Sequence, residues 1–242
     1  MTNVNEEIEA RTEHARRVRA MFEAIAARYD LLNHLLSANF DRGWRQAVVE
    51  RVREAAGQAR SRVLDVACGT GDLALAIASQ VEARVIGLDF CRPMLTLAKR
   101  KAAVADLPLP LIEGDALRLP FADATFDIVT IAFGLRNLAS VEAGLGEFRR
   151  VLRPGGMIAI LEFSHPQVPG FRALFNLYFD HLLPRIGGWI SGDRQAYQYL
   201  PRSVRNFPDQ RKLAKMMEQM GFQKVSYRNL TGGIAAIHVG VR

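Results

Sequence analysis

The chain has 242 residues, 49% of them hydrophobic, with a formal net charge of +7 and two cysteines. This length and composition suffice for the core of one domain, and so few cysteines exclude a disulfide scaffold and indicate a reduced, cytoplasmic setting. No apolar run reaches the roughly 18 residues of a membrane span, and the polar, acidic residues 1–7 do not follow the pattern of a signal peptide. The positive charge is compatible with nucleic acid or an anionic membrane surface and selects neither.

The first predicted unit is a helical segment, residues 1–58, ahead of the first core strand. After a frayed start over residues 1–13, apolar residues at helical spacing predict an amphipathic helix, namely Val18, Met21, Phe22 and Ile25. A second helix is expected to begin near Asp41. Because this segment precedes the sheet, we expect it to fold over the carboxyl edge of the strands as a lid. A purely structural cap is the alternative.

The remaining residues, 59–242, form the predicted core, in which strands and helices alternate. Strands are expected at 62–66, 84–88, 109–113, 126–131 and 157–163, with helices at 71–79, 92–104 and 140–152. This alternation is typical of an α/β fold, a parallel sheet flanked by helices. The last of these strands is almost continuously apolar, which favours a central position in the sheet.

A helical insertion is predicted over 166–205, within the core. Apolar residues surround most of the helix expected over 171–190, so it should be buried, line an apolar tunnel or contact lipid. Flanking arginines suit an anionic membrane surface, and ordinary core packing is the alternative. A helix at 208–220 and strands at 223–230 and 233–241 complete the chain, and a terminal hairpin differs from the six-stranded dinucleotide fold.

The most informative stretch is 63–74, in which a buried strand is followed by a glycine turn and a helix. Gly69 and Gly71 allow a tight turn that a residue with a Cβ would resist. We expect this order to place bare N–H groups and a helix N-terminus at the carboxyl edge of the sheet, where a nucleotide-like ligand can bind. With Ala74, the same spacing also fits the dinucleotide fingerprint, so the glycines alone do not select the ligand.

Acidic residues follow three successive predicted strands, Asp65, Asp89 and Asp115. A cationic sulfonium and its ammonium suit an acidic pocket, whereas a pyrophosphate does not. The pattern resembles the class I S-adenosylmethionine-dependent methyltransferases, a Rossmann-like fold of seven strands. A nicotinamide enzyme, or acids that only cap helices, are the alternatives. The resemblance implies that the methionine part of the cofactor is contacted by Asp65, Gly69, Thr70 and Gly71. It implies that Asp89 contacts the ribose, and that Asp115 and Ala116 contact the adenine.

Three further stretches narrow the resemblance. They are Tyr29-Asp30-x-x-Asn33-x-x-x-Ser37-x-x-x-Asp41-x-x-Trp44, Phe133-Gly134-Leu135-Arg136-Asn137, and Arg150-Val151-Leu152-Arg153-Pro154-Gly155-Gly156 continuing to Ser164. Together they resemble the ubiquinone/menaquinone biosynthesis C-methyltransferases, the UbiE/MenG family, from about Val18 to the C-terminus. Ala132 stands where this family often carries serine, so a cofactor contact there would use the backbone.

The resemblance implies methylation of a ring carbon on a reduced, prenylated quinol, and no metal is required. Ionisation of a quinol hydroxyl pushes charge onto the ortho carbon, which can then attack a methyl group held in line with it. Arg136 could stabilise the phenolate, Asn137 could orient the hydroxyl, and Tyr29 could bind substrate or cofactor. His165 is a candidate base because histidine titrates near neutrality. Each of these four residues also has a structural alternative.

Several alternatives stay open. Demethylmenaquinol is the favoured substrate because the N-terminal extension of ubiquinone-pathway members is missing, but 2-methoxy-6-polyprenyl-1,4-benzoquinol, or both, would fit. A nucleic-acid methyltransferase would share the core, yet Ile131-Ala132-Phe133-Gly134 lacks the prolines of amino-group methylases, so we expect no nucleic-acid partner. A non-enzymatic scaffold would not need intact acids. Peripheral membrane contact, a homodimer and a quinone-biosynthetic assembly are all compatible with the sequence.

Overall fold

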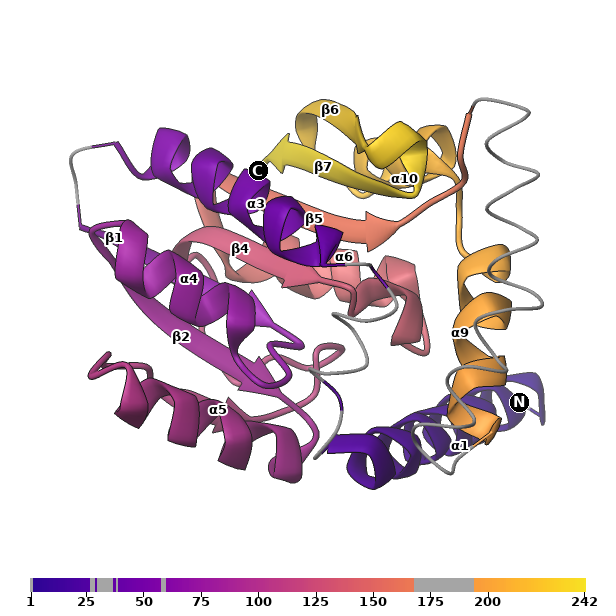
Figure 1. The fold of residues 1–242 in the computed structure, drawn as a ribbon. Helices are drawn as coiled ribbons and strands as arrows, with labels where there is room; N and C mark the ends of the chain where they lie inside the picture. Colours follow the sequence, from indigo (N-terminus) through magenta and orange to yellow (C-terminus); the bar gives the residue numbers. More distant parts are fainter. Residues whose placement is uncertain (1, 27–28, 30–36, 38, 58–59, 168–193) are drawn as a thin grey trace.

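The structure is a computed structural model, and it describes residues 2–26, 29, 37, 39–57, 60–167 and 194–242. Seven strands form one sheet in the order β3-β2-β1-β4-β5-β7-β6 (Figure 1). In chain order they are β1 (Ser61–Val66), β2 (Ala83–Asp89), β3 (Leu111–Glu113), β4 (Phe126–Ala132), β5 (Leu152–Phe163), β6 (Gln223–Leu230) and β7 (Ala235–Val241). The first five are parallel, and β7 is antiparallel to β5 and β6. The predicted α/β class and terminal hairpin are confirmed.

Helices cover both faces of the sheet. They are α1 (Thr2–Ile25), α3 (Phe40–Ala56), α4 (Asp72–Gln80), α5 (Arg92–Val104), α6 (Val141–Val151), α9 (Arg194–Asn206) and α10 (Gln210–Gln219), with short 3₁₀ turns η2 (Leu135–Asn137) and η4 (Thr231–Gly233). Because successive side chains of a strand point to opposite faces, Val63 and Leu64 of β1 enter different cores. Val63 packs with Val48 of α3 and Ile77 of α4. Leu64 belongs to the opposite core, with Phe148 of α6.

Most predicted element boundaries agree with the structure within two residues, and three larger or informative differences remain. β3 begins at Leu111 rather than at residue 109, because Pro110 has no N–H to donate to a neighbouring strand. β5 begins at Leu152 because the Pro-Gly-Gly turn pairs with the C-terminal residue, Gly155 N–H donating to the Arg242 carbonyl at 2.9 Å. α1 is helical from Thr2, where fraying was expected, since Glu, Ala and Arg are good helix formers.

The helical insertion predicted over 166–205 is described only in part. The apolar stripe at 171–190 lies outside the described residues. From Arg194 the chain forms α9, which the apolar pattern did not reveal. Among the described residues, no helix is both long enough and apolar enough to cross a membrane. Figure 1 places α1 beyond the arrowheads of β2 and β4, so the first helix of the chain lies at the carboxyl edge of the sheet.

Candidate functional site

A cavity of about 760 Å³ opens at the carboxyl ends of β1, β2 and β4. Its floor includes Ala67 after β1, Asp89 at the end of β2 and Ala132 at the end of β4. Its far wall comes from α1, through Thr12, Ala15, Arg16, Arg19 and Phe22. A site between the strand ends of an open α/β sheet, where the strand order reverses, is where such folds bind ligands. The cavity therefore brings the predicted acidic edge and the N-terminal helix together around one space.

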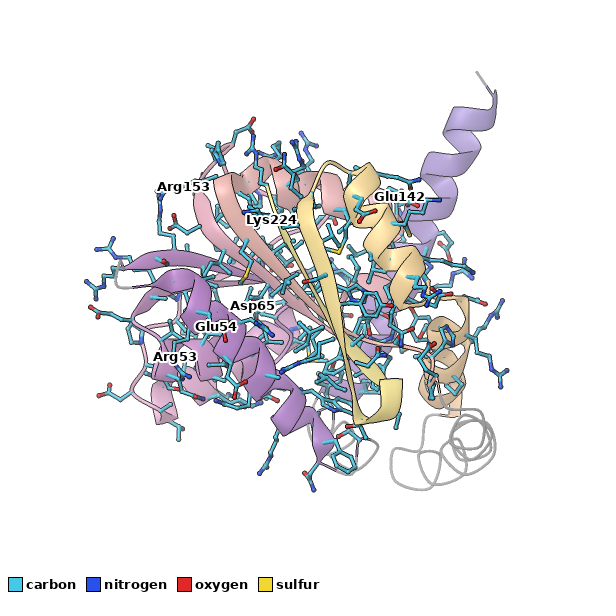
Figure 2. The ribbon with its side chains drawn as sticks, turned by 90° about the horizontal axis from the view of Figure 1, so that it is seen from above. Arg53, Glu54, Asp65, Glu142, Arg153 and Lys224 are labelled. Carbon is cyan, nitrogen blue, oxygen red and sulfur yellow. The ribbon has the colours of Figure 1, made fainter. Side chains whose placement is uncertain are left out.

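Asp65 lies deep beside this cavity, in a small polar pocket of about 30 Å³ that also includes Arg45, Thr70 and Tyr29. Its side chain is 1% exposed, and Figure 2 shows it in the interior of the fold. Oδ1 accepts a hydrogen bond of 2.7 Å from Thr130 of the paired strand, whereas Oδ2 has no partner among the described residues. Burial raises the pKa of Asp65 to about 7, against the Thr130 hydrogen bond and the Arg45 charge. The unpartnered oxygen needs a donor, and a cation would suit it best.

Asp89 holds the glycine turn in place. Its Oδ2 accepts from Gly69 N–H and its Oδ1 from Cys91 N–H, both at 2.8 Å. Gly71 N–H donates in turn to the Cys68 carbonyl at 2.9 Å. The expectation of bare N–H groups is therefore wrong for both glycines, because acceptors within the fold already take them. A turn whose amides already donate to the Asp89 carboxylate and the Cys68 carbonyl is a poor site for a pyrophosphate. Asp89 itself lines the cavity and can face a ligand there.

Thr70 and Gly71 have different roles from Gly69. Gly69 lines the cavity, and a Cβ there would meet only Tyr29, at 3.9 Å. Thr70 lies in the small pocket with Asp65, where its hydroxyl accepts from Lys101 Nζ at 2.9 Å. Gly71 lines neither space: its φ is +84°, and a Cβ would lie 3.1 Å from Ala98. Gly71 thus allows α4 and α5 to approach closely, and cofactor contact by Gly71 stays a prediction.

Asp115 and Ala116 line the cavity beyond β3, as expected for the third acid. Oδ1 of Asp115 accepts from Leu117 N–H at 2.8 Å, which fixes the loop. Phe90, directly after Asp89, lines the same cavity. The three acids therefore lie along one connected region, with the buried Asp65 at one end and Asp115 at the other.

The backbone is strained where the two strand ends meet. Ala67 and Phe133, which follow β1 and β4, have φ values of +51° and +57°. A non-glycine residue in this region costs on the order of 1–3 kcal/mol and is most often found at functional sites. A Cβ on Gly134 would lie 2.6 Å from the Ala67 Cβ, so the two loops are in close contact. Ala132, between them, lines both the cavity and the small pocket.

Arg136 does not line either space. Its Nη1 lies 2.8 Å from Glu162 Oε1 and also bonds the Phe133 carbonyl, while its backbone N–H donates to Glu162 Oε2 at 3.2 Å. The side chains of Arg136 and Glu162 are 7% and 1% exposed. The guanidinium also lies 5.2 Å from the centre of the Phe163 ring. The predicted phenolate-stabilising cation is thus a member of a buried ion pair, and a role in the chemistry stays a prediction.

Asn137 and Tyr29 do line the cavity, and Tyr29 reaches the small pocket as well. His165 lies elsewhere. Its Nε2 is 3.3 Å from the Phe207 carbonyl, and its own carbonyl accepts from Gln210 at 3.1 Å. Of the four residues predicted to act on the substrate, the structure therefore brings two to the cavity. The histidine anchors the chain after β5, and its role as a base stays a prediction without support from this geometry.

Three side chains of the site were not predicted as site residues. Arg19 of α1 lines the cavity and donates to the Phe90 carbonyl at 2.6 Å, its guanidinium 5.4 Å from the centre of the Phe90 ring. Arg45 lines the small pocket and pairs with Asp41 one turn earlier, a spacing that could have been read as an i,i+4 pair. Tyr199 of α9 donates to Asn137 Oδ1 at 3.1 Å. No local pattern predicts the first or the last contact.

S-adenosylmethionine fits the residues that are present. The unpartnered Asp65 oxygen suits the ammonium of the methionine part, Asp89 suits vicinal ribose hydroxyls, and Asp115 suits an adenine amine. The part of the chain that the structure describes contains no group of three histidine, cysteine or acidic side chains that could hold a metal ion.

Comparison with known proteins agrees with this geometry. Residues 9–242 match the model of the ubiE/COQ5 methyltransferase family. A demethylmenaquinone methyltransferase from Deinococcus radiodurans is 52% identical over 226 residues, 92% of this chain and 91% of that protein. The ubiquinone/menaquinone biosynthesis C-methyltransferase UbiE of Geotalea uraniireducens is 44% identical over 235 residues, 95% of this chain and 97% of that protein. A SAM-dependent methyltransferase structure from Thermotoga maritima aligns with a TM-score of 0.67 at 15% identity, covering 93% of this chain and 99% of that chain, which supports the fold alone.

Proposed function

Because this chain belongs to the ubiE/COQ5 methyltransferase family and is an S-adenosylmethionine-dependent methyltransferase, we propose that it methylates a ring carbon of a reduced, prenylated quinol. The favoured substrate is demethylmenaquinol, the substrate class in the name of the Deinococcus radiodurans relative. The name of the Geotalea uraniireducens relative covers ubiquinone biosynthesis too, so the methoxybenzoquinol is the second candidate.

One observation carries the proposal. A single cavity of about 760 Å³ is lined by two of the acids suited to the cofactor, Asp89 and Asp115, and by the polar amide of Asn137. A cavity of this size lies within the range of small-molecule sites and has room for a second reactant beside the cofactor. Donor and acceptor of the methyl group could therefore lie in one space, as direct transfer requires.

The chain's own residues would hold the cofactor from both ends. Asp65 would accept from the ammonium through its unpartnered Oδ2, and Asp89 would accept from the ribose hydroxyls. Arg19 and Phe90 would form the wall beyond the ribose. S-adenosylmethionine then supplies a methyl group on a cationic sulfonium. The carboxylates of Asp65 and Asp89 would stabilise this cation electrostatically, and their own hydrogen bonds to hydroxyl and backbone donors hold them in place.

On the substrate side, the enzyme must favour the ionised quinol over the neutral one. Among the side chains that line the cavity, Asn137 is a neutral donor beside the end of β4 and would donate to a developing phenolate through Nδ2. Tyr29 borders both spaces and could contact the substrate or the methionine part. Arg136 is neutralised by Glu162 at 2.8 Å, so its field at the cavity is that of a dipole more than of a free charge. The proton acceptor is not assigned to a residue.

We further propose that α1 acts as a lid over the cofactor. It contributes five residues to the cavity wall, and its Phe22 packs with the cluster of Ala26, Cys91 and Met94. A closed wall on this side would exclude water and prevent hydrolysis or misdirected transfer. Peripheral membrane contact and self-association are finer proposals, which flotation with anionic vesicles and analytical ultracentrifugation would test.

The decisive experiment measures methyl transfer from labelled S-adenosylmethionine to two reduced quinols offered separately. Label in demethylmenaquinol alone would support the favoured substrate, and label in both quinols would indicate one enzyme for both reactions. Label in neither, with cofactor binding verified by calorimetry, would reject the quinol proposal and return a nucleic-acid substrate to consideration.

A further inference from the structure

Asn137 is held, through its backbone and its side chain, by residues from three separate parts of the chain. Its backbone N–H donates to the Gly134 carbonyl at 3.0 Å, and its carbonyl oxygen lies 3.2 Å from Nε2 of His14 in α1. Its side-chain Nδ2 donates to the Phe133 carbonyl at 3.2 Å, and its Oδ1 accepts from the hydroxyl of Tyr199 at 3.1 Å. Both ends of the side-chain amide are therefore anchored, one by Phe133 directly after β4 and the other by Tyr199 of α9.

These two anchors select one orientation of the amide. The Phe133 carbonyl can only accept, so it requires the Nδ2 end. The Tyr199 hydroxyl fills the opposite end by donating to Oδ1. Nδ2 carries two N–H groups, and one of them is engaged by Phe133. The second remains for a ligand in the cavity that Asn137 lines.

We propose that Tyr199 is a positioning residue, which fixes the Asn137 amide so that the second N–H of Nδ2 donates to the quinol oxygen that gains negative charge. This inference rests on the proposed function. It deepens it by stating how the substrate oxygen is recognised: by a neutral donor that is oriented before the substrate arrives. Donors fixed in advance stabilise a developing oxyanion more than donors that must reorient during the reaction.

The surroundings of Tyr199 keep it a donor. It is half-buried, and burial raises the pKa of its phenol, with the nearby charge of Arg136 acting in the opposite direction and that of Glu162 in the same direction. The hydroxyl therefore stays protonated through the neutral range and continues to donate. Tyr199 sits 62 residues from Asn137 along the chain, so the contact joins α9 to the turn after β4. No other element described here bonds Asn137 Oδ1.

The first test is Tyr199→Phe, which removes one oxygen and keeps the ring. We expect kcat to fall by about tenfold. This is less than the fall of about a hundredfold or more that follows when an oxyanion donor is removed, because the variant keeps the donor and loses only its fixed orientation. The affinity for S-adenosylmethionine should stay within twofold, since Tyr199 lines neither space described for the cofactor. The rise of kcat with pH should shift to higher pH, because a bound quinol without a fixed donor ionises less readily. Tyr227→Phe, at an exposed tyrosine of β6, is the matched control and should leave all three quantities unchanged.

The second test is a double-mutant cycle with Asn137→Ala. If Tyr199 acts through Asn137, adding Tyr199→Phe to Asn137→Ala should lower kcat no further. Two independent, multiplying losses would overturn the proposal. Unchanged kcat in Tyr199→Phe would overturn it as well.

A measurement without substrate separates this inference from the proposed function. The side-chain amide of Asn137 gives a pair of ¹⁵N–¹H resonances, which can be assigned by their absence in Asn137→Ala. In Tyr199→Phe these resonances should move, since Oδ1 loses its donor, whereas Tyr227→Phe should leave them in place. Resonances that do not move would refute the positioning role even if the quinol is the true substrate. If they move while no quinol is methylated, the proposed function fails and the orientation of the amide stands.

Discussion

Replacing Arg136 by alanine should destabilise the protein more than any exposed arginine substitution. The change leaves Glu162, whose side chain is 1% exposed, without the guanidinium 2.8 Å away. Breaking a buried pair from one side costs about 3–5 kcal/mol, because an uncompensated charge stays behind. The lost contact with the Phe163 ring, 5.2 Å from the guanidinium carbon, adds about 0.5–2 kcal/mol. Domains have only about 5–15 kcal/mol of total stability, so the variant should be close to unfolding.

Urea denaturation at neutral pH measures this loss directly. Arg153→Ala is the matched control: Arg153 pairs with Asp127 at 2.5 Å, but with side chains 41% and 29% exposed, at the periphery of the fold (Figure 2). Its loss should cost at most about 1 kcal/mol. The double variant Arg136→Ala/Glu162→Gln removes the stranded charge and should recover much of the stability. If Arg136→Ala costs no more than Arg153→Ala, the pair is not buried as described and the reasoning is refuted.

The same two variants separate structure from catalysis. Arg136→Ala should bind cofactor and lose turnover. If the double variant recovers both stability and turnover, Arg136 serves only to hold the loop after β4. If stability returns and turnover does not, the positive charge itself acts on the developing phenolate.

Four further predictions concern the glycine turn and the acids beside it. Below about pH 7 the affinity for S-adenosylmethionine should weaken about tenfold per pH unit, because Asp65 with its raised pKa must lose a proton to bind an ammonium. Calorimetry from pH 5.5 to 7.5 should find this slope. If the slope persists in Asp65→Asn, the assignment of the ammonium to Asp65 is contradicted. The raised pKa of Asp65 also affects the stability of the cofactor-free protein. The stabilisation from protonated Asp65 is fully present below the pKa of an unfolded aspartate and is lost as pH rises through about 7. Asp65→Asn should therefore flatten the fall of the free energy of unfolding over that pH range. Asp89→Ala should abolish measurable cofactor binding, since it removes both a ligand and the acceptor of the Gly69 amide, and unchanged affinity would overturn the ribose placement. Gly71→Ala should lower the free energy of unfolding more than Gly155→Ala, measured by urea or thermal unfolding. Both glycines have φ near +80°, where alanine costs roughly 1–2 kcal/mol of strain, but of the two only Gly71 has a neighbour that a Cβ would meet, Ala98 at 3.1 Å. Equal losses would refute the packing argument.

Local patterns predicted the parts of the fold whose cause is local. The alternation of apolar runs with Gly- and Pro-containing turns located β1, β2, β4 and the C-terminal hairpin. The acids after three strands indicated the edge of the sheet at which the cavity lies. The start of β5 could not be located this way, because it depends on pairing with Arg242 at the far end of the chain. The state of the Gly69 amide was misjudged for a similar reason: its acceptor, Asp89, stands 20 residues later.

Site residues followed the same division. Asp65, Asp89 and Asp115 could be found because a strand end is a position that sequence can indicate. Tyr199 could not, since a tyrosine in a polar helix has no local sign of its partner, although α9 falls almost entirely within the helical insertion predicted over 166–205. Arg136 was found as a charged residue near the site, but its neutralisation by Glu162, 26 residues later, required the structure.

The hydrogen bonds of Asn137 also bear on the order in which the protein assembles and opens. They join residues 123 and 62 positions apart, so the entropy cost of loop closure favours their formation after the more local contacts. We therefore expect the turn after β4 to take its final shape late in folding, once α1 and α9 have reached it. In native-state hydrogen exchange such a turn should open at lower free energy than β1 or β4, whose amides lie in the middle of the sheet. Substrate entry and product exit would then need only this local opening, while the sheet that carries the acids stays folded.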